Sequence, residues 1–401
     1  MRSSYDVVVI GGGLLGCSLA WELASDNIDV LLLERDQINQ HASGRNAGSL
    51  HFQLEYRMIQ PGLEAARRAA EAIPLHLRAA ELWQLMSREI GPDLGLSQKG
   101  GLMLADDADS ARLLEAKGDV ERDWGLDVRL LDGAEAHALA PYLSDSVVAA
   151  AFCPIEGKAN ARTAAAAIGR AAAAAGAEVR TNSSVTAVER QGSRWSLQVS
   201  LPGATAPARH VSCDSVILAA GVWCNELAAM FGASLPVEPI ALSMTVTART
   251  TSFIPYLIQH AGARLSLKQT EEGNVLIGGG WPARLPHTVA GAPDLSQAPE
   301  ILVESLVGNA DAAARVVPRV GSLSILRTWA GTTTVAPDQL PVVGPIPGVP
   351  GVYVATGGSA FTLGPAFAEL LSEMVQGRSP SLDLTPYAVD RFASAVPAPS
   401  R

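Results

Sequence analysis

The sequence has few cysteines, and their spacing does not suit a metal site. The four cysteines, Cys17, Cys153, Cys213 and Cys224, stand far apart and include no CxxC pair. Iron–sulfur clusters and structural zinc ions are held by closely spaced cysteines. We therefore expect no metal site in this chain, and we expect the four thiols to be reduced and buried.

Positive charge is also scarce. The chain has 30 Lys and Arg residues against 40 Asp and Glu residues, which gives a net charge of −10 and a pI of about 5.2. Nucleic acids and anionic membranes are bound largely through basic surfaces. The composition therefore predicts that nucleic acid is not a partner.

Long apolar runs are missing as well. No run of 18 apolar residues is present, so a membrane-spanning helix is not expected. Residues 7–21 are apolar enough to suggest a signal peptide, but Asp6 precedes them, Glu22 follows them and a glycine cluster interrupts them. We therefore expect a cytoplasmic protein. With 401 residues, 48% of them hydrophobic, the chain is long enough for one or two compact domains.

A glycine-rich turn near the N-terminus lies between a predicted strand, residues 7–10, and a predicted helix, residues 14–24. Gly11, Gly13 and Gly16 form the pattern GxGxxG. The first glycine permits the tight turn, the second lets a pyrophosphate approach the backbone, and the third packs the helix on the strand. The N–H groups at the start of the helix would then face the phosphates. The pattern predicts a dinucleotide site, although a glycine-rich loop that binds nothing is the alternative.

A second predicted strand, residues 30–33, is followed directly by Glu34. A carboxylate at this place can accept hydrogen bonds from ribose hydroxyls, which favours an adenosine diphosphate group without a 2′-phosphate. NAD and FAD both fit the pattern at this point.

Two later segments again place glycine after an apolar strand. Residues 216–221 form an apolar run that ends in Ala-Ala-Gly, where bare backbone can approach a flat or phosphorylated ligand. Residues 352–355 are a predicted strand followed by Gly357 and Gly358, and then by Gly364 and a helix whose N-terminus would face a ligand. A core strand and an ordinary strand-to-helix turn are the alternatives.

The sequence between these segments divides by type. An alanine-rich helix is predicted over residues 160–175, and alternating strands follow it up to residue 200. Residues 80–145 are rich in helical patterns, and residues 235–325 are rich in strand patterns. We expect these last two segments to form a second domain.

Several motifs, considered together, make the chain resemble the D-amino-acid oxidase superfamily of FAD-dependent amine oxidoreductases along nearly its whole length. The motifs are HASGRNAGSLHFQ (41–53), GGLMLA (100–105), EGKANARTAAAA (156–167), VILAAGVW (216–223), SLKQTEEGNVLIGGGWPA (266–283) and RTWAG with PDQLPVVG (327–344). Within that superfamily, NAGSLH, SLKQ and GGGWPA are most similar to the beta subunits of opine and D-hydroxyproline dehydrogenases. Sarcosine oxidase beta subunits and glycine oxidase are more distant in this comparison.

The resemblance implies an α/β Rossmann-type FAD-binding domain, interrupted in sequence, plus an α+β substrate domain with a mostly antiparallel sheet above the flavin. We expect the FAD-binding domain to comprise residues 1–80, 146–230 and 326–396, and the substrate domain to comprise residues 81–145 and 231–325. Residues 397–401 are expected to form a loose tail.

The implied reaction is oxidation of a carbon–nitrogen bond next to a carboxylate. Hydride passes from the α-carbon of a neutral amine to flavin N5, and the imine then hydrolyses. FAD supplies the electron chemistry, and the protein supplies orientation and polarity. The related dehydrogenases work beside an alpha subunit and a small iron–sulfur subunit, so the resemblance implies such partners here.

The resemblance also implies which residues bind FAD. The loop that holds the pyrophosphate and the flavin ring matches Ser43, Gly44, Arg45, Asn46, Ala47 and Gly48. The loop and helix start that cover the pyrimidine end match Gly357, Gly358, Ser359, Thr362, Leu363 and Gly364. The remaining expected cofactor residues are Gly11, Gly13, Leu15, Gly16, Glu34, Arg35, Val185, Ala220, Gly221, Trp223 and Gly331. A surface role is the alternative for Arg45.

The substrate end departs from the family pattern. Glycine oxidase and D-amino-acid oxidase place a carboxylate-binding arginine soon after the WAG motif, whereas this chain has threonines at 332–334. The candidates for substrate contact are therefore His51, Lys268, Arg264 and Trp281. The alternatives are a structural histidine, two charges on the surface of an edge strand and a tryptophan that anchors the core.

Two further features bear on the chemistry. The lysine that activates oxygen in monomeric sarcosine oxidase is replaced by apolar residues around Leu276 and Ile277, which favours a dehydrogenase over a stand-alone oxidase. His41 lies in a pattern similar to the histidine that attaches FAD covalently in dimethylglycine dehydrogenases, but we expect non-covalent FAD because a loop histidine is usually solvated. A non-catalytic FAD-binding subunit is the third interpretation.

Overall fold

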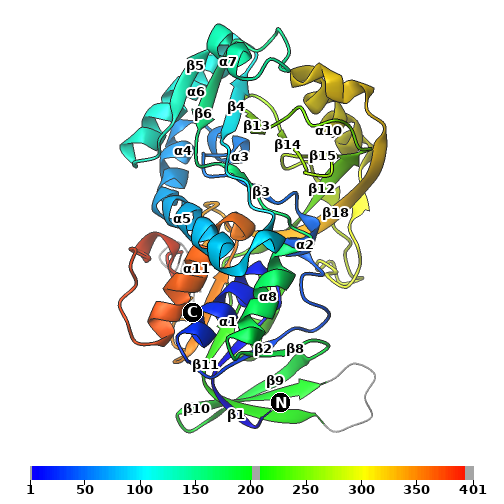
Figure 1. The fold of residues 1–401 in the computed structure, drawn as a ribbon. Helices are drawn as coiled ribbons and strands as arrows, with labels where there is room; N and C mark the ends of the chain where they lie inside the picture. The colour runs from blue at the N-terminus through cyan, green and yellow to red at the C-terminus, as the bar shows by residue number, and fades with distance from the viewer. Residues whose placement is uncertain (1, 201–207, 393–401) are drawn as a thin grey trace, which may run out of the picture.

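Two eight-stranded sheets form the framework of the protein and lie one above the other (Figure 1). The computed structural model describes residues 2–200 and 208–392, so the tail expected at 397–401 lies outside the described residues. Within those two ranges, no helix is both long and apolar enough to cross a membrane.

The lower sheet has the strand order β19-β20-β11-β1-β2-β8, and the five strands from β20 to β8 run parallel. Alternate side chains of β1 point to opposite faces of the sheet. Val7 and Val9 pack in the core on one face, and Val8 and Ile10 pack in the core on the other. A hairpin of β9 and β10 extends the sheet next to β11. The bounds are β1 Ser4–Ile10, β2 Val30–Leu33, β8 Glu178–Arg180, β9 Ser184–Gln191, β10 Arg194–Ser200, β11 Arg209–Leu218, β19 Val342–Pro345 and β20 Val352–Thr356.

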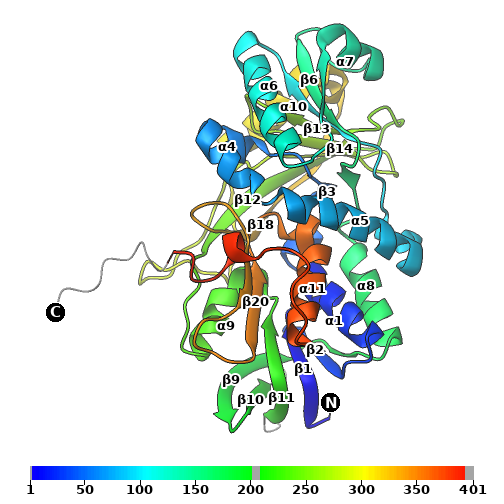
Figure 2. The same ribbon diagram turned by 90° about the vertical axis from the view of Figure 1, so that its left-hand side faces the viewer.

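Four helices cover one face of this sheet, and Figures 1 and 2 show α1 between α8 and α11 with α5 above them. Helix α9 packs on the opposite face. The bounds are α1 Leu14–Ser25, α5 Ile73–Ile90, α8 Ala164–Ala174, α9 Cys224–Met230 and α11 Ala360–Val375. The first two strands and α1 agree closely with the sequence-based prediction.

Two helices begin at other places than the sequence predicted. Helix α8 begins at Ala164, four residues after the expected start. Helix α11 begins at Ala360, so Gly364 lies inside the helix and not before it. Inside the helix, Gly364 has a packing role. A Cβ on Gly364 would lie 3.0 Å from a methyl group of Leu14, so the missing side chain lets α11 approach α1.

The upper sheet has the order β18-β12-β15-β14-β13-β4-β6-β5, and every pair except β13 with β4 is antiparallel. The mostly antiparallel sheet expected from the sequence is thus present. Strand β6 lies in the segment 146–230, and all of β18 except its first residue lies in the segment 326–396. Both strands belong to this upper sheet, although the two segments were expected to form part of the FAD-binding domain. The bounds are β4 Gly101–Ala105, β5 Arg129–Asp132, β6 Ala149–Cys153, β12 Glu238–Thr247, β13 Leu257–His260, β14 Ser266–Gln269, β15 Val275–Gly278 and β18 Ile325–Val335.

Short elements connect and flank the two sheets. Strand β3 pairs with β7, and β16 pairs with β17. Helices α7 and α10 pack on one face of the upper sheet, while α3, α4 and α6 pack on the other. The bounds are α2 Ala42–Arg45, α3 Tyr56–Ile59, α4 Leu63–Ala70, α6 Ala108–Asp123, α7 Gly133–Leu139, α10 Val303–Val316, β3 Ser49–Leu50, β7 Gly157–Lys158, β16 Ala283–Arg284 and β17 Glu300–Ile301.

All four cysteines are free and buried, as the sequence predicted. Burial raises the pKa of each thiol, to about 12 for Cys17, Cys213 and Cys224 and further for Cys153. The thiols are therefore protonated at neutral pH.

A buried polar network holds the segment that follows β3. Glu156 accepts hydrogen bonds from the backbone N–H groups of Phe52 (2.9 Å) and Gln53 (3.0 Å), and Glu121 accepts one from the N–H of Leu54 (2.6 Å). Lys117 donates to Glu121 Oε2 (2.6 Å) and to Gln53 Oε1 (3.0 Å). Both charged partners of the Lys117–Glu121 pair are 0% exposed, so water cannot replace either one.

The buried pair predicts a large effect of removing its cation. Lys117→Met leaves the Glu121 carboxylate buried without its partner, so we expect the free energy of unfolding to fall by about 3–5 kcal/mol. Urea denaturation followed by circular dichroism measures the change. Lys99→Met, at an exposed lysine, is the control. A loss of less than about 1 kcal/mol for Lys117→Met, within the range of ordinary substitutions, would contradict this account.

Glu22 of α1 predicts a pH dependence of stability. Burial, followed by the charges of Glu369 and Asp26, raises the pKa of Glu22 from 4.5 to about 7. A carboxyl group that binds its proton more tightly in the folded state stabilises the fold at low pH, and this contribution is lost as the pH rises from about 4.5 through 7. Glu22→Gln should therefore raise the melting temperature at pH 8 more than at pH 5. Glu115→Gln, at an exposed helical position, should show no such difference, and equal shifts at both pH values for Glu22→Gln would refute the prediction.

Candidate active site

A cavity of about 470 Å³ lies between the two sheets and draws its walls from both. The lower sheet contributes the turn after β1 and the ends of β2, β11 and β20, while β12, β14, β15 and β18 of the upper sheet contribute the roof. This volume is within the usual range for sites that bind cofactors and small molecules.

The glycine turn after β1 forms one wall. Gly11 has a φ of +119°, and a Cβ there would lie 2.5 Å from the carbonyl oxygen of Ala219 at the end of β11. A Cβ on Gly16 would lie 1.8 Å from Gly11 O, so the third glycine does pack α1 on the turn. Gly13 instead faces the cavity, and its Cβ would meet only Ser43 Oγ, at 2.9 Å. Ser43 Oγ accepts the N–H of Leu14 (3.0 Å), so this N–H of the first helical turn already has a partner.

Glu34 lies beside this turn at the end of β2 and is 8% exposed. Its Oε2 accepts the N–H of Gly12 (2.6 Å), and its Oε1 accepts the N–H of Asp36 (2.7 Å). A carboxylate oxygen offers two acceptor sites. Each oxygen of Glu34 therefore keeps one site with which a ribose hydroxyl could bond.

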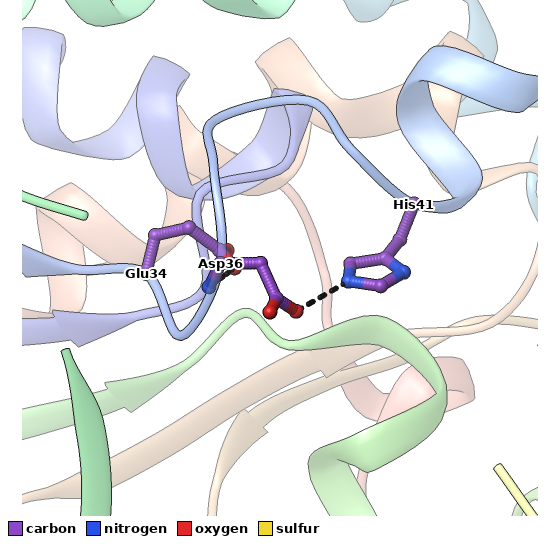
Figure 3. A group of neighbouring side chains, drawn as sticks. All are labelled: Glu34, Asp36 and His41. Atoms are coloured by element: carbon purple, nitrogen blue, oxygen red, sulfur yellow. Dashed lines mark hydrogen bonds and ion pairs between the residues drawn. The ribbon is translucent and has the colours of Figure 1, made fainter. Parts of the chain in front are cut away.

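His41 lies at the same end of the cavity (Figure 3). Its Nε2 is 2.8 Å from Asp36 Oδ2, and this hydrogen bond lowers the pKa of Asp36. The ring packs edge-on against Trp223, with centroids 4.7 Å apart, and the Arg35 guanidinium lies 4.5 Å from the Trp223 ring on its face. His41 thus belongs to a cluster next to the expected ribose site, and this position gives no support to an attached flavin ring.

The side-chain oxygens of Glu34 and Asp36 and a ring nitrogen of His41 lie within 4.8 Å of one another. Figure 3 shows the same three side chains together. The hydrogen bonds described above account for their proximity, so the cluster needs no metal ion to explain it.

The predicted flavin loop is tightly folded. Asn46 Oδ1 accepts the N–H of Gly48 (2.6 Å), and the carbonyl oxygen of Arg45 accepts the Trp329 Nε1–H (2.6 Å). A Cβ on Gly48 would lie 2.2 Å from Ala159 O. The Arg45 side chain faces the cavity and donates from Nε to Gln40 O (3.1 Å), so it is not only a surface charge.

The opposite end of the cavity is formed by the start of α11. Gly357 and Gly358 have positive φ angles of 76° and 44°, and Ser359, just before the helix, has a φ of 56°. A Cβ on Gly358 would lie 2.7 Å from Pro341 N. Thr362 is buried and donates weakly to Ser49 O (3.4 Å). The N-terminal backbone of a 16-residue helix therefore points at the cavity.

Most of the residues predicted to bind the cofactor line this cavity. They are Gly11, Gly13, Leu15, Glu34, Arg35, Ser43, Arg45, Asn46, Ala47, Val185, Ala220, Gly221, Trp223, Gly331, Gly357, Gly358, Ser359 and Thr362. Five lie behind its walls, namely Gly16, Gly44, Gly48, Leu363 and Gly364. These five positions allow close backbone packing or fill the core.

His51 is the predicted substrate residue that does reach the cavity. It is 8% exposed, and its Nε2 lies 2.9 Å from Ser266 Oγ on β14. Its Nδ1 is buried and has no hydrogen-bond partner among residues 2–200 and 208–392. A buried nitrogen without a partner is costly, and this one is enclosed by protein atoms and does not face the cavity.

Lys268 and Arg264 do not line the cavity. Lys268 is 3% exposed on β14, a central strand, because its side chain turns behind Gly48 and donates to Ala159 O (3.2 Å). Burial, together with the charge of Lys158, holds the pKa of Lys268 well below its usual value. Arg264 precedes β14, and its side chain is exposed. The expectation that both are substrate contacts from the roof is therefore not supported, and Lys268 is not a surface charge on an edge strand either.

Trp281 also lies outside the cavity. Its ring packs against α10, where a Cβ on Gly308 would lie 2.2 Å from a ring carbon. Its Nε1–H donates to Arg264 O (3.0 Å). The alternative interpretation of Trp281, an anchor in the core, fits these contacts better than a pocket wall.

Three charged residues that line the cavity were not expected from the sequence, namely Glu55, Arg57 and Glu226. Glu55 and Arg57 come directly after the segment held by Glu156. Their nearness to His51 in sequence was the one available signal, but the four-residue helix α3 that carries Arg57 is too short to show a pattern. The threonines at 332–334 also line the cavity, where the family pattern has an arginine.

The residues present fit FAD. A backbone cradle at the start of α1, the free acceptor sites of Glu34 and a second helix N-terminus at α11 lie along one cavity.

Comparisons with known proteins agree with this description. A family model described as FAD dependent oxidoreductase matches residues 6–374. The chain is similar to glycine oxidase of Geobacillus kaustophilus, with 26% identity, 99% of this chain and 99% of that protein covered. It is similar to a subunit of opine oxidase from Rhizobium meliloti, with 26% identity over 96% of this chain and 97% of that protein. The structure of L-proline dehydrogenase from P. horikoshii has the same fold, with a TM-score of 0.84, 24% identity and 98% and 99% of the two chains covered.

These values correct one expectation. The motifs placed glycine oxidase further away than the opine dehydrogenase subunits, whereas the two relatives are equally identical to this chain. Similarity judged from short motifs depends on a few residues around one site, whereas identity over the full length counts every aligned residue.

The position of Gly13 at the cavity predicts that one added methyl group there weakens FAD binding. Gly13 has a φ of −79°, which alanine tolerates, and only Ser43 Oγ lies near the added Cβ. Gly13→Ala should therefore fold normally but weaken FAD binding by about tenfold or more, because the methyl group occupies the approach to the backbone. Titration of the FAD-free protein, followed by flavin fluorescence, measures the dissociation constant. Gly118→Ala in α6, outside the cavity, is the matched control, and unchanged FAD affinity in Gly13→Ala would count against this site.

Proposed function

Because the chain belongs to the family of FAD-dependent oxidoreductases, we propose that it oxidises the carbon–nitrogen bond of an N-substituted, cyclic or D-configured amino acid. The observation that carries this proposal is the cavity itself. It joins a nucleotide-binding turn at one end to His51, Arg57 and the start of α11 at the other, beneath an antiparallel roof.

Different residues along the cavity would hold different parts of FAD. The backbone N–H groups of Gly13 and Leu15 would hold the pyrophosphate, Glu34 would hold the ribose, and the N-terminus of α11 would favour negative charge at the pyrimidine end. Bound FAD supplies the acceptor for the electron pair that leaves the α-carbon. The roof residues Leu242 and Met244 would exclude water from the reacting carbon.

His51 is proposed to contact the substrate amine or carboxylate. His51 lines the cavity, and its ring is held by the hydrogen bond between Nε2 and Ser266 Oγ. No acid–base residue is needed for the electron transfer itself when the substrate binds as the free amine.

A dehydrogenase is the favoured form of this function, and a stand-alone oxidase is the second candidate. The apolar residues Leu276 and Ile277 support the dehydrogenase. The similarity to a glycine oxidase supports the oxidase. Lys268 pairs directly with Leu276 across β14 and β15, but its amino group lies behind Gly48 and outside the cavity, so it does not add to the support for the oxidase.

Partner subunits form part of the proposal. One similar protein is named as a subunit of opine oxidase, which implies that it works in an assembly. We propose an alpha subunit and a small iron–sulfur subunit that receives the electrons, together with a cytoplasmic location. A non-catalytic FAD-binding subunit is the competing function, and the threonines at 332–334 in place of the family arginine favour it.

Anaerobic mixing tests the proposal. The purified, FAD-loaded protein is mixed without oxygen with glycine, sarcosine, proline, D-amino acids and opines, and the flavin absorption is followed. We expect at least one of these amines to bleach the flavin, and we expect slow recovery of the colour when air is admitted. A free FAD solution and a protein sample without amine are the controls.

Two other outcomes of this experiment would each favour one of the two competing functions. Rapid recovery of the flavin colour in air with release of peroxide would favour the oxidase. Failure of the whole panel to bleach the flavin, even with an artificial electron acceptor present, would favour the non-catalytic subunit.

A further inference from the structure

Arg57 stands out among the cations that line the cavity. Arg35 lies over the Trp223 ring beside the ribose site, and Arg45 donates to Gln40 O. Arg57 instead contacts Ser359 at the start of α11. Of the arginines that line the cavity in the described part of the chain, it is the one held at this end.

The guanidinium of Arg57 is fixed by three side chains. Nη1 donates to Gln339 Oε1 (2.8 Å), and Nη2 donates to Glu55 Oε1 (3.1 Å) and to Ser359 Oγ (3.0 Å). A guanidinium carries five N–H donors. The hydrogen on Nε and one hydrogen on Nη1 remain for a ligand, and the side chain is 31% exposed.

Glu55 lies between Arg57 and Ser359. Ser359 Oγ donates to the same Glu55 oxygen, Oε1 (2.8 Å). Burial alone would raise the pKa of Glu55, but the charges of Arg57 and His51 and the Ser359 hydroxyl hold it at about 2. The carboxylate is therefore ionised at neutral pH, and the Glu55–Arg57 pair has no net charge.

The surroundings of the pair are mostly uncharged. The roof above the cavity contributes Ile240, Leu242 and Met244 from β12 and the threonines at 332–334 from β18. Such walls suit an apolar side chain or N-substituent, and they offer no second fixed cation.

We propose that Arg57 binds the carboxylate of the substrate and that Glu55 positions the guanidinium and limits the charge that the site accepts. This inference rests on the proposed function and narrows its substrate class to amino acids with one carboxylate and an apolar side chain or N-substituent. The N–H donors that remain on Arg57 can bond to one carboxylate, and Glu55 already places one negative charge beside them. A second carboxylate, as in opines, would be buried without a partner, which is costly.

The test uses the FAD-loaded protein and three unreactive probes, namely pyrrole-2-carboxylate, its methyl ester and pyrrole-2,5-dicarboxylate. Binding is read from the change that each probe causes in the flavin absorption. The variants are Arg57→Met, Arg57→Lys and Glu55→Gln. Arg315→Met is the matched control, because Arg315 also pairs with a carboxylate, Asp106, but lies outside the cavity.

We expect the wild-type protein to bind the monocarboxylate about 10- to 100-fold more tightly than its methyl ester, as hydrogen bonds to a charged group imply. Arg57→Met should remove this preference, Arg57→Lys should keep part of it, and Arg315→Met should keep all of it. Glu55→Gln should improve binding of the dicarboxylate relative to the monocarboxylate, because it adds one unit of positive charge to the pair. A purely structural role of Glu55 would leave that ratio unchanged.

Failure of this inference can be distinguished from failure of the proposed function. Equal binding of the monocarboxylate by the wild-type protein and a folded Arg57→Met variant, or no change of the ratio in Glu55→Gln, would overturn this inference while amines still bleach the flavin. A protein that takes up no FAD, or whose flavin no amine bleaches, would overturn the proposed function, and the inference would fall with it.

Discussion

The contact between the Gly11 backbone and the end of β11 is the constraint on which the site depends. With a hypothetical Cβ only 2.5 Å from Ala219 O, the turn after β1 can lie this close to β11 only without a side chain. This contact sets the start of α1 next to Ala220 and Gly221, while Gly364 lets α11 lie against the same helix. Three glycine-containing segments, distant in sequence, thereby line one cavity.

The second requirement is that the upper sheet be held over this floor. The segment after β3 does this, because Glu156 and Glu121 bind its backbone N–H groups from one side. Further along the same segment, Arg57 bonds to Ser359 and Gln339 of the lower part. His51 and Arg57 are thus placed by groups from both halves, and their positions follow from the relation between the two sheets.

The sequence allowed the cofactor end to be predicted in detail, and the substrate end only in outline. Glycine turns, a carboxylate after β2 and a helix start are local features, and the structure brings them together as expected. Lys268 and Trp281 depend instead on which strand neighbours β14 and how α10 packs on the roof. No local pattern in the sequence shows which strands become neighbours or how a helix packs on them. Arg57 was missed because it lies in one turn of helix whose only distinctive property is its three-dimensional position.

The burial of the four thiols has a consequence for the lifetime of the protein. Oxidants attack the thiolate and not the protonated thiol, and all four pKa values are raised far above neutrality. Four protonated and enclosed thiols are poor targets for peroxide and other oxidants, so we expect sulfenic acid and unwanted cross-links to form slowly in this chain.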